Sequence, residues 1–368
     1  MSELMSELMK VEFGRKGPMV TKLGFGGIPI QTVSRAEAVK VVRYAYEKGI
    51  RFFDTARAYT TSEECIGEAL RDVRNEVFIA TKSGSRDLTV IKQDFEKSLT
   101  NLRTDRVDLF MFHNIMNEDA LNKILADNGP YMYLKEEQKA GRVGLIGFSS
   151  HSADTALIAA QKGLFASVEF PFNYLEDQCL TRLLPLTRES GMGFIVMKPF
   201  AGGELSSASA ALKWLYVKNV DVIIPGMMSC DQVDAAISAA KAVEPLLRKT
   251  YALRDVLDIV APPLSPGEQA AIEHDRETLS RRFCRRCQYC LPCPNGISVN
   301  GVISMEQLFN RSGWHKVGEQ QIAMLKKALE CTSCGTCEAR CPYELPLASL
   351  VKPTAEQLLR KIEEMRRA

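Results

Sequence analysis

The sequence predicts an α/β fold in which a closed (β/α)8 barrel of the TIM type is followed by a second, smaller domain. Short apolar segments alternate with amphipathic ones up to about residue 240, and there are eight of each. The apolar segments are continuous runs, as expected for parallel strands that are covered on both faces. Strict alternation over this length favours a closed eight-stranded barrel.

The elements follow one another in a regular order. The predicted strands cover residues 22–27, 50–56, 76–83, 107–113, 143–150, 165–173, 192–200 and 220–226. The predicted helices cover residues 34–48, 63–73, 90–102, 133–141, 153–163, 179–191, 208–219 and 230–243. The first helix begins at Ser34, a residue type that favours helix N-termini, and ends at Gly49. An open doubly wound sheet is the alternative, but no G-x-G-x-x-G motif opens the first βα unit.

The alternation ends after Lys249. The segment 261–267, APPLSPG, is dense in proline and glycine, which end one structural unit and begin another. We therefore place the domain boundary near Pro262, with the barrel in residues 1–262 and a small, mainly α-helical domain in residues 263–368. Within the second domain we expect a helix over residues 318–330.

The composition is that of a globular protein of the cell interior. The 368-residue chain has a formal net charge of +2 and no dense basic segment, which argues against a nucleic-acid partner. No apolar run reaches the roughly 18 residues that a membrane-spanning helix needs. The N-terminal sequence MSELMSELMK lacks the features of a signal peptide. We therefore expect a cytoplasmic protein without a membrane partner.

Eight of the eleven cysteines lie in two motifs near the C-terminus. The first motif reads C-x2-C-x2-C-x2-C-P, and the second reads C-x2-C-x2-C-x3-C-P, which is the bacterial ferredoxin spacing. In such runs three closely spaced cysteines bind one cubane cluster, and the fourth, beside proline, binds the other cluster. The predicted ligands of one [4Fe-4S] cluster are Cys284, Cys287, Cys290 and Cys341, and those of the second are Cys331, Cys334, Cys337 and Cys293.

Structural zinc is the alternative occupant of the cysteine motifs, because four-cysteine zinc sites also use C-x2-C pairs. Successive triplet spacing that ends in Cys-Pro suits a cubane better than a tetrahedral ion. Disulfides are a poor alternative, since clustered cysteines in a reducing cytosol indicate metal binding.

Four polar residues fall at the carboxyl ends of three successive predicted strands. Asp54 ends the second strand and Tyr59 lies in the loop after it, while Lys82 and His113 end the third and fourth strands. A barrel of this type carries its chemistry at this end. Each residue alone has a structural explanation, such as a helix cap for Asp54 or a solvated strand end for Lys82. Their coincidence predicts an active site at one barrel mouth.

The four residue types can together polarise a carbonyl group. A tyrosine can protonate a developing alkoxide when a nearby cation lowers its pKa, which is ordinarily about 10. Lys82 is the expected cation, Asp54 would hold it charged and in place, and His113 would orient the carbonyl oxygen by hydrogen bonding. We expect this site to act while a bound cofactor delivers a hydride.

The segments FFDTARAY, IATKSG and LFMFHN resemble the aldo-keto reductases, whose Asp, Tyr, Lys and His tetrad matches Asp54, Tyr59, Lys82 and His113. The resemblance continues through VGLIGFSSH, FPFNYLE, MKPFAGG and VIIPGM, over about the first 250 residues. It implies a βα barrel that binds NADP(H) or NAD(H) in extended form and reduces aldehydes or ketones. The cofactor contacts implied by the resemblance are Ser149, Glu169, Asn173, Lys198, Pro225, Gly226 and Gln232.

The resemblance implies that these residues contact different parts of the cofactor. Ser149 would hold the nicotinamide carboxamide, with Glu169 and Asn173 near it. Pro225 and Gly226 would open the phosphate loop before the last helix, whose N-terminus can accept a phosphate.

Several positions depart from the family pattern. Met197 stands where many members place an aromatic residue, Lys198 where a small residue is common, and Glu169 where a glutamine is usual. Gln232 stands where many members carry an arginine for the 2′-phosphate. NADPH and NADH therefore both remain open.

The barrel and the cysteine motifs together resemble a branch of the aldo-keto reductases that carries a C-terminal ferredoxin-like domain. The favoured function is NAD(P)H-dependent reduction of a small aldehyde or ketone, with Tyr59 as general acid and the clusters structural or regulatory. One alternative is an electron-transfer enzyme whose clusters feed the barrel or a redox protein such as ferredoxin. Another is a non-catalytic redox sensor. A hydride carries two electrons whereas a cubane passes one at a time, so direct coupling ordinarily requires a flavin or radical intermediate.

Overall fold

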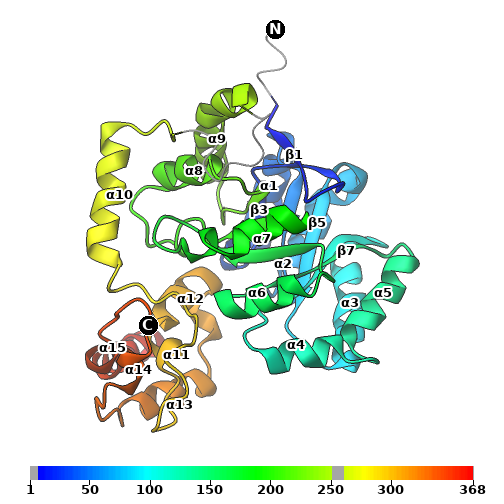
Figure 1. Ribbon diagram of the computed structural model, residues 1–368. Helices are drawn as coiled ribbons and strands as arrows, with labels where there is room; N and C mark the ends of the chain where they lie inside the picture. Colours follow the sequence, from blue (N-terminus) through cyan, green and yellow to red (C-terminus); the bar gives the residue numbers. More distant parts are fainter. Residues whose placement is uncertain (1–6, 251–260, 368) are drawn as a thin grey trace. The chain divides into compact units, whose positions relative to one another are not determined.

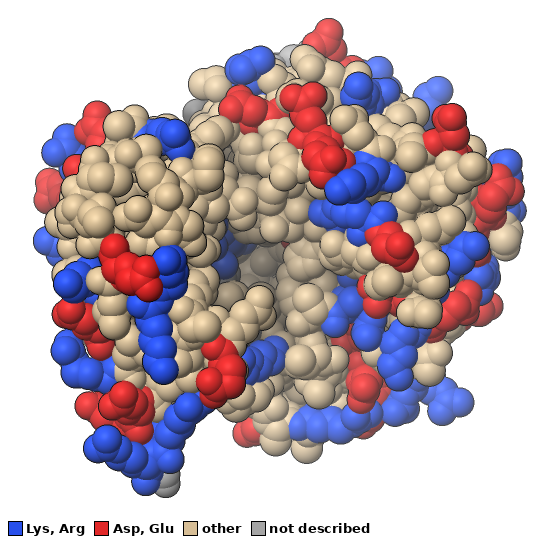
Figure 2. All heavy atoms as spheres, turned by 90° about the horizontal axis from the view of Figure 1, so that it is seen from below, with Lys and Arg blue, Asp and Glu red and all other residues tan. Residues whose placement is uncertain are grey.

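The computed structural model describes residues 7–250 and 261–367. The chain divides into two units, Met1–Ile272 and Glu273–Ala368, and the division falls within helix α10 (Pro266–Leu279). Acidic and basic side chains are intermixed on the surface seen in Figure 2, in keeping with a net charge of +2. Among the described helices, none has both the length and the apolar run that a membrane crossing requires.

The first unit contains a parallel sheet whose strands are hydrogen-bonded in the order of the sequence (Figure 1). The strands are β3 (Phe25–Gly26), β4 (Phe52–Asp54), β5 (Phe78–Ser83), β6 (Val107–Phe112), β7 (Val143–Ser149), β8 (Ser167–Pro171), β9 (Gly193–Met197) and β10 (Val222–Ile223). Parallel bridges join Leu23 to Ile223 and Gly26 to Gly226, so the last strand returns to the first. The structure thus confirms the predicted eight-stranded barrel.

Buried phenylalanines account for much of the barrel core. Phe52 and Phe78 stack with ring centroids 5.0 Å apart, and Phe95 on a covering helix meets Phe110 on β6 edge to face at 5.5 Å. Burying one such side chain contributes about 1.5–3 kcal/mol. The strands are covered on one face by the barrel interior and on the other by helices. This explains why their sequences are continuous apolar runs.

Several helices of the first unit begin at polar residues whose side chains cap free N–H groups. Ser34 and Glu37 form a capping box at the first helix, and Gly49, with a positive φ of 100°, follows its end. Asp87 and Asn117 cap two later helices in the same way. The helices are α1 (Arg35–Glu47), α2 (Ser62–Leu70), α3 (Leu88–Leu102), α4 (Glu118–Leu125), α5 (Pro130–Lys139), α6 (Ala153–Gln161), α7 (Leu183–Ser190), α8 (Ala208–Tyr216) and α9 (Cys230–Thr250).

Two features of the first unit were not predicted. Strands β1 (Lys10–Glu12) and β2 (Met19–Thr21) form an antiparallel hairpin before the barrel. Phe13 of this hairpin packs against Phe52 and Phe78 at 5.8 and 5.6 Å, and therefore covers the end of the barrel where the strands begin. In addition, two helices, α4 and α5, connect β6 to β7 where one was expected.

The second unit is built from helices around its own core. After α10 come α11 (Val299–Ile303), α12 (Met305–Ser312), α13 (Glu319–Ala328), α14 (Thr336–Ala339) and α15 (Leu347–Arg367). Helix α13 confirms the helix expected over residues 318–330. Apolar residues of α11, α13 and α15, among them Val302, Leu325 and Val351, are buried together. This core holds the loops that carry the cysteine motifs.

Candidate functional site

The carboxyl ends of the barrel strands bring the predicted polar residues to one place. Asp54 is the last residue of β4, Lys82 precedes the last residue of β5, and His113 follows β6. In the register of the sheet Asp54 pairs with Ala80, and Ser149 pairs with Glu169. Parallel strands in this register end at the same edge, which places these side chains at one mouth of the barrel.

Lys82 lies at the centre of this group and is buried. Its Nζ donates to Oδ1 and Oδ2 of Asp54 at 2.5 and 2.6 Å and to the backbone carbonyl of Thr55 at 2.9 Å. Burial alone lowers the pKa of Lys82, but the charges of Asp54 and Glu169 outweigh burial, so its pKa rises above the usual value. The lysine therefore stays an ammonium ion inside the barrel.

Glu169 is a second carboxylate beside the same lysine. Its Oε2 is 3.1 Å from Lys82 Nζ, and Glu169 is only 1% exposed. Burial first, and then the charge of Glu169, raises the pKa of Asp54 well above its usual range, and the bonds from Lys82 only partly oppose this. The site thus contains two buried carboxylates around one ammonium ion.

Tyr59 and His113 lie next to this charged group. Lys82 Nζ is 5.5 Å from the centre of the Tyr59 ring, and the Tyr59 and His113 rings meet edge to face at 5.9 Å. Burial, followed by the positive charges of Lys82 and Arg86, lowers the pKa of His113 to about 3. The imidazole is therefore neutral at physiological pH and can donate one N–H to a ligand.

A buried carboxylate fixes the loop that carries Tyr59. Glu63, at the start of α2, is 1% exposed and accepts hydrogen bonds from Thr81, Ser98 and Asn101 at 2.7, 2.7 and 3.1 Å. Arg57, in the Tyr59 loop, also donates to Glu63. No sequence motif indicated Glu63. Its spacing to Ile66 and Leu70, on the buried face of the helix, is the signal that could have found it.

Arg86 ties two loops of the mouth together. Its guanidinium donates to the backbone carbonyls of Gly84 and Ser85 at 3.0 and 3.1 Å, and to those of His113 and Asn114 at 2.8 and 2.9 Å. These bonds join the loops that follow β5 and β6. No sequence motif marked this residue, because its partners are backbone atoms.

Three of the predicted cofactor contacts lie near the mouth with definite protein partners. Ser149, at the end of β7, is buried, and its Oγ accepts the backbone N–H of Asn114 at 2.8 Å. The Asn173 amide donates to Glu176 Oε2 at 2.9 Å and to the carbonyl of Lys198 at 3.1 Å. Lys198 follows β9 in a left-handed conformation with φ 53°. The Asn173 side chain therefore braces the turns that follow β8 and β9.

The remaining predicted contacts lie between β10 and α9. Pro225 and Gly226 close the barrel, since the Pro225 carbonyl accepts the N–H of Gly26 at 2.8 Å and Gly226 is bridged to Gly26. The Gln232 side chain accepts the N–H of Met228 at 2.8 Å in the first turn of α9. This segment is thus held in place by its own hydrogen bonds.

The cysteines of the second unit lie near one another, within and between the two motifs. The thiols that influence the pKa of Cys287 include Cys284 and Cys341, and those that influence the pKa of Cys337 include Cys331 and Cys293. Cys290 is influenced by Cys284, Cys287 and Cys337. Burial, and then these neighbouring thiols, raises the pKa of Cys287 to about 11. In the described part of the chain, no three His, Cys, Asp or Glu side chains lie close enough together to hold a single metal ion.

The loops around the cysteines direct backbone N–H groups at the sulfurs. Tyr289 donates its N–H to Cys287, and Thr336 donates its N–H to Cys334. Left-handed residues between the cysteines, such as Arg286 with φ 61° and Ser333 with φ 53°, give the loops the tight curvature that this requires. Such N–H···S contacts are typical of iron–sulfur ligands.

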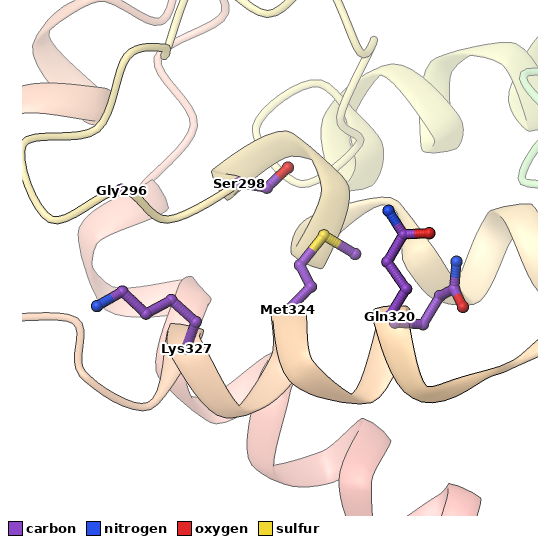
Figure 3. A pocket seen from close by; sticks show the side chains of 6 residues that line it. Gly296, Ser298, Gln320, Met324 and Lys327 are labelled. Atoms are coloured by element: carbon purple, nitrogen blue, oxygen red, sulfur yellow. The ribbon is translucent and has the colours of Figure 1, made fainter.

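A surface hollow of about 410 Å³ lies in the second unit (Figure 3). Met324 and Gln320 rise from α13 toward Ser298, and Lys327 extends along its edge. The lining residues are Gly296, Ser298, Gln320, Gln321, Met324 and Lys327.

Two family models match the chain. A model of the aldo/keto reductase family matches residues 22–210, which is more than half of the chain. A model of a 4Fe-4S dicluster domain matches residues 283–346, the segment that contains both cysteine motifs.

Individual proteins show the same relationship. L-galactose dehydrogenase of Arabidopsis thaliana is 28% identical over 298 residues, which cover 68% of this chain and 93% of that protein. Aldo-keto reductase str7 of Strobilurus tenacellus is 30% identical over 213 residues, covering 55% of this chain and 61% of that protein. The structure of an aldo-keto reductase from Bacillus halodurans, in its holo form, superposes with a TM-score of 0.59 at 22% identity, over 73% of this chain and 96% of that chain. That structure supports the fold.

Proposed function

The chain belongs to the aldo/keto reductase family, and from this we propose that it is an NAD(P)H-dependent oxidoreductase that reduces a small aldehyde or ketone to an alcohol. The observation that carries the proposal is Lys82, a fully buried ammonium ion held by Asp54 beside the ring of Tyr59. A buried cation next to a tyrosine favours the tyrosinate form and makes the hydroxyl a better acid.

The groups at the mouth suit a nicotinamide. The buried Ser149 hydroxyl can donate to a carboxamide oxygen, and the buried Glu169 carboxylate can accept from a carboxamide NH₂. When bound, the reduced nicotinamide supplies the hydride. The residues around Gln232 would determine the preference between NADPH and NADH. The Gln232 amide carries no charge to pair with a 2′-phosphate.

The residues of the chain would then act on the carbonyl oxygen. His113, neutral because of its low pKa, would donate one hydrogen bond that orients the oxygen. Tyr59 would transfer its hydroxyl proton to the same oxygen as negative charge develops there. Lys82 would stabilise the tyrosinate left behind, and Asp54 would keep Lys82 in position.

The second unit would hold two [4Fe-4S] clusters, one on Cys284, Cys287, Cys290 and Cys341 and the other on Cys331, Cys334, Cys337 and Cys293. The grouping of neighbouring thiols and the N–H groups directed at their sulfurs support this assignment. Residues 263–368 would form this iron–sulfur domain after a barrel of residues 1–262. A reducing compartment such as the cytoplasm suits thiolates that bind iron. In this proposal the clusters are structural or regulatory.

A second candidate function is one-electron exchange with a redox protein such as ferredoxin. The observation that favours it is that Cys334 is exposed, whereas Cys284 and Cys290 are buried. A cluster ligated at the surface is accessible to an electron-transfer partner.

An anaerobic titration of the iron-loaded protein with NADPH and then NADH tests both functions. The absorbance of the cofactor and the visible sulfur-to-iron absorption are followed together, before and after a mixture of aldehydes is added. Carbonyl reduction predicts that cofactor is consumed only with aldehyde present and that the visible band stays constant. Bleaching of the visible band by the cofactor alone would instead favour electron transfer through the clusters.

A further inference from the structure

Two carboxylates share one ammonium ion at the barrel mouth. Asp54, from β4, and Glu169, from β8, both contact Lys82 of β5, at 2.5 and 3.1 Å. All three residues are at most 2% exposed. The other titratable or charged groups around this trio are Tyr59, which is near Lys82, and His113, which is influenced by Lys82 and by Arg86.

Charge balance makes full ionisation of this trio costly. With both carboxylates ionised, the three groups would carry one net negative charge away from water. Two carboxyl groups close together repel each other when both are ionised, which raises their free energy. Keeping one proton between them lowers this free energy. The neutral His113 offers no compensating charge.

We propose that Asp54 and Glu169 hold one shared proton beside Lys82, and that Glu169 is a positioning residue that returns this proton, through Lys82, to Tyr59 after each turnover. The inference rests on the proposed reduction. It assigns to Glu169 a role in proton transfer that is separate from any contact with the nicotinamide.

The proton balance is complete within the named groups. When the alcohol forms, the Tyr59 O–H bond breaks and an O–H bond forms on the substrate oxygen. As the Lys82 ammonium passes one proton to the tyrosinate oxygen, it takes another from the protonated carboxyl pair, so Lys82 is an ammonium ion before and after the transfer. Water later restores the proton of the pair. These steps move no electrons, since both electrons of the reduction arrive with the hydride.

Two observations support the shared proton. The buried Glu169 carboxyl lies with its Oε2 3.1 Å from Lys82 Nζ, the same ammonium group that Asp54 contacts at 2.5 Å. The pKa of Asp54 is raised well above its usual range by burial, then by the charge of Glu169, with a hydrogen bond between the two side chains acting in the same direction.

The test compares Glu169→Gln with Glu176→Gln. Glutamine has the shape of glutamate but neither its charge nor its titratable proton. Glu176 is also 1% exposed, and it forms hydrogen bonds with the side chain and backbone of Asn173. It therefore controls for the loss of a buried carboxylate in the same region.

The first measurement needs no substrate. We expect the infrared C=O stretch of a protonated carboxyl group at pH 7 in the unmodified protein and in Glu176→Gln, and its loss in Glu169→Gln. If the band is absent from the unmodified protein, or persists in Glu169→Gln, the shared proton does not exist. This result stands whether or not any carbonyl substrate is found.

The second measurement separates proton return from cofactor contact. With a carbonyl substrate and saturating cofactor, Glu169→Gln should lower steady-state kcat by roughly tenfold or more, and should lower the single-turnover rate of cofactor oxidation by much less, because Tyr59 starts protonated. The pH dependence of kcat should also shift, while that of Glu176→Gln should not. An equal fall in both rates would indicate a simple contact and overturn the proposed role. If the unmodified protein oxidises no cofactor with any carbonyl compound, the proposed function fails instead.

Discussion

The rings of Tyr59 and His113 meet edge to face, with their centroids 5.9 Å apart and their planes at 87°. Tyr59→Phe preserves this ring contact and removes only the hydroxyl group. We expect the variant to keep its thermal unfolding midpoint and its cofactor affinity, and to lose roughly 10²–10⁴-fold in kcat, the contribution of a general acid. Steady-state kinetics with cofactor titration by fluorescence measures both quantities.

Tyr44→Phe is the matched control for this change. Tyr44 lies on α1 and donates to Asp234 at 2.7 Å, away from the barrel mouth. Its kcat should equal that of the unmodified protein. Comparable activity of Tyr59→Phe and Tyr44→Phe would show that Tyr59 is not the acid.

The low pKa of His113 predicts a pH dependence of stability. Burial and two neighbouring cations lower this pKa from 6.5 to about 3. Between these values the unfolded chain binds a proton that the folded chain does not, so the free energy of unfolding rises with pH across this window and falls as the pH drops through it. The full effect is on the order of 5 kcal/mol. Chemical denaturation at several pH values should show a shallower dependence for His113→Gln.

His274→Gln supplies the comparison, because His274 is exposed on α10. Its pH dependence of unfolding should match that of the unmodified protein. For the same reason, His113 should cause no inflection near pH 6.5 in the pH profile of kcat/KM. His113→Gln should therefore leave that part of the profile unchanged. Such an inflection would mean that His113 titrates in the folded protein.

Glu63 predicts a link between stability and the Tyr59 loop. Glu63→Ala leaves Thr81, Ser98 and Asn101 without their acceptor and Arg57 without its anion. Loss of one partner from such a buried network costs about 3 kcal/mol or more. We expect a lower urea midpoint together with a lower kcat.

Glu64→Ala tests whether the destabilisation expected for Glu63→Ala comes from the burial of Glu63. The neighbouring Glu64 pairs with Arg35 at 2.9 Å on the surface, with 39% of its side chain exposed. Exposed pairs contribute about 0–1 kcal/mol, so this variant should unfold almost like the unmodified protein. Equal destabilisation by the two substitutions would contradict the role assigned to Glu63.

Removing one cysteine should empty one cluster and leave the other. For anaerobically reconstituted protein we expect Cys334→Ala to lower the iron content from about eight to about four atoms per chain, since each cubane needs four thiolates. Cys230→Ala, at the start of α9, should leave the iron content unchanged. Elemental analysis is the direct measurement, and two zinc ions in place of iron would support the tetrahedral alternative.

The sequence was sufficient for the barrel because its strands are short apolar runs in strict alternation with helices. It also indicated that Asp54, Lys82 and His113 end neighbouring strands, which the structure places at one mouth. The contact between Lys82 and Glu169 joins β5 to β8, which are not adjacent strands, so it depends on the curvature of the closed barrel.

Other features lacked a sequence signal. The strands of the β1–β2 hairpin have three residues each, too few for a periodic pattern. Helix α4 is only eight residues long, and its buried residues are Leu121 and Ile124. The bonds of Arg86 end on backbone carbonyls, which every residue carries, so no spacing of side chains could reveal them.

The bridge between Gly26 and Gly226 also constrains how the protein is made. Proteins are synthesised from the N-terminus, so β3 leaves the ribosome long before the strand that must pair with its open edge. Until β10 emerges, the nascent sheet presents unpaired backbone at both sides, a condition that promotes aggregation and slow folding. The cysteine motifs emerge later still, so any iron that they bind would be delivered after all eight barrel strands have been synthesised.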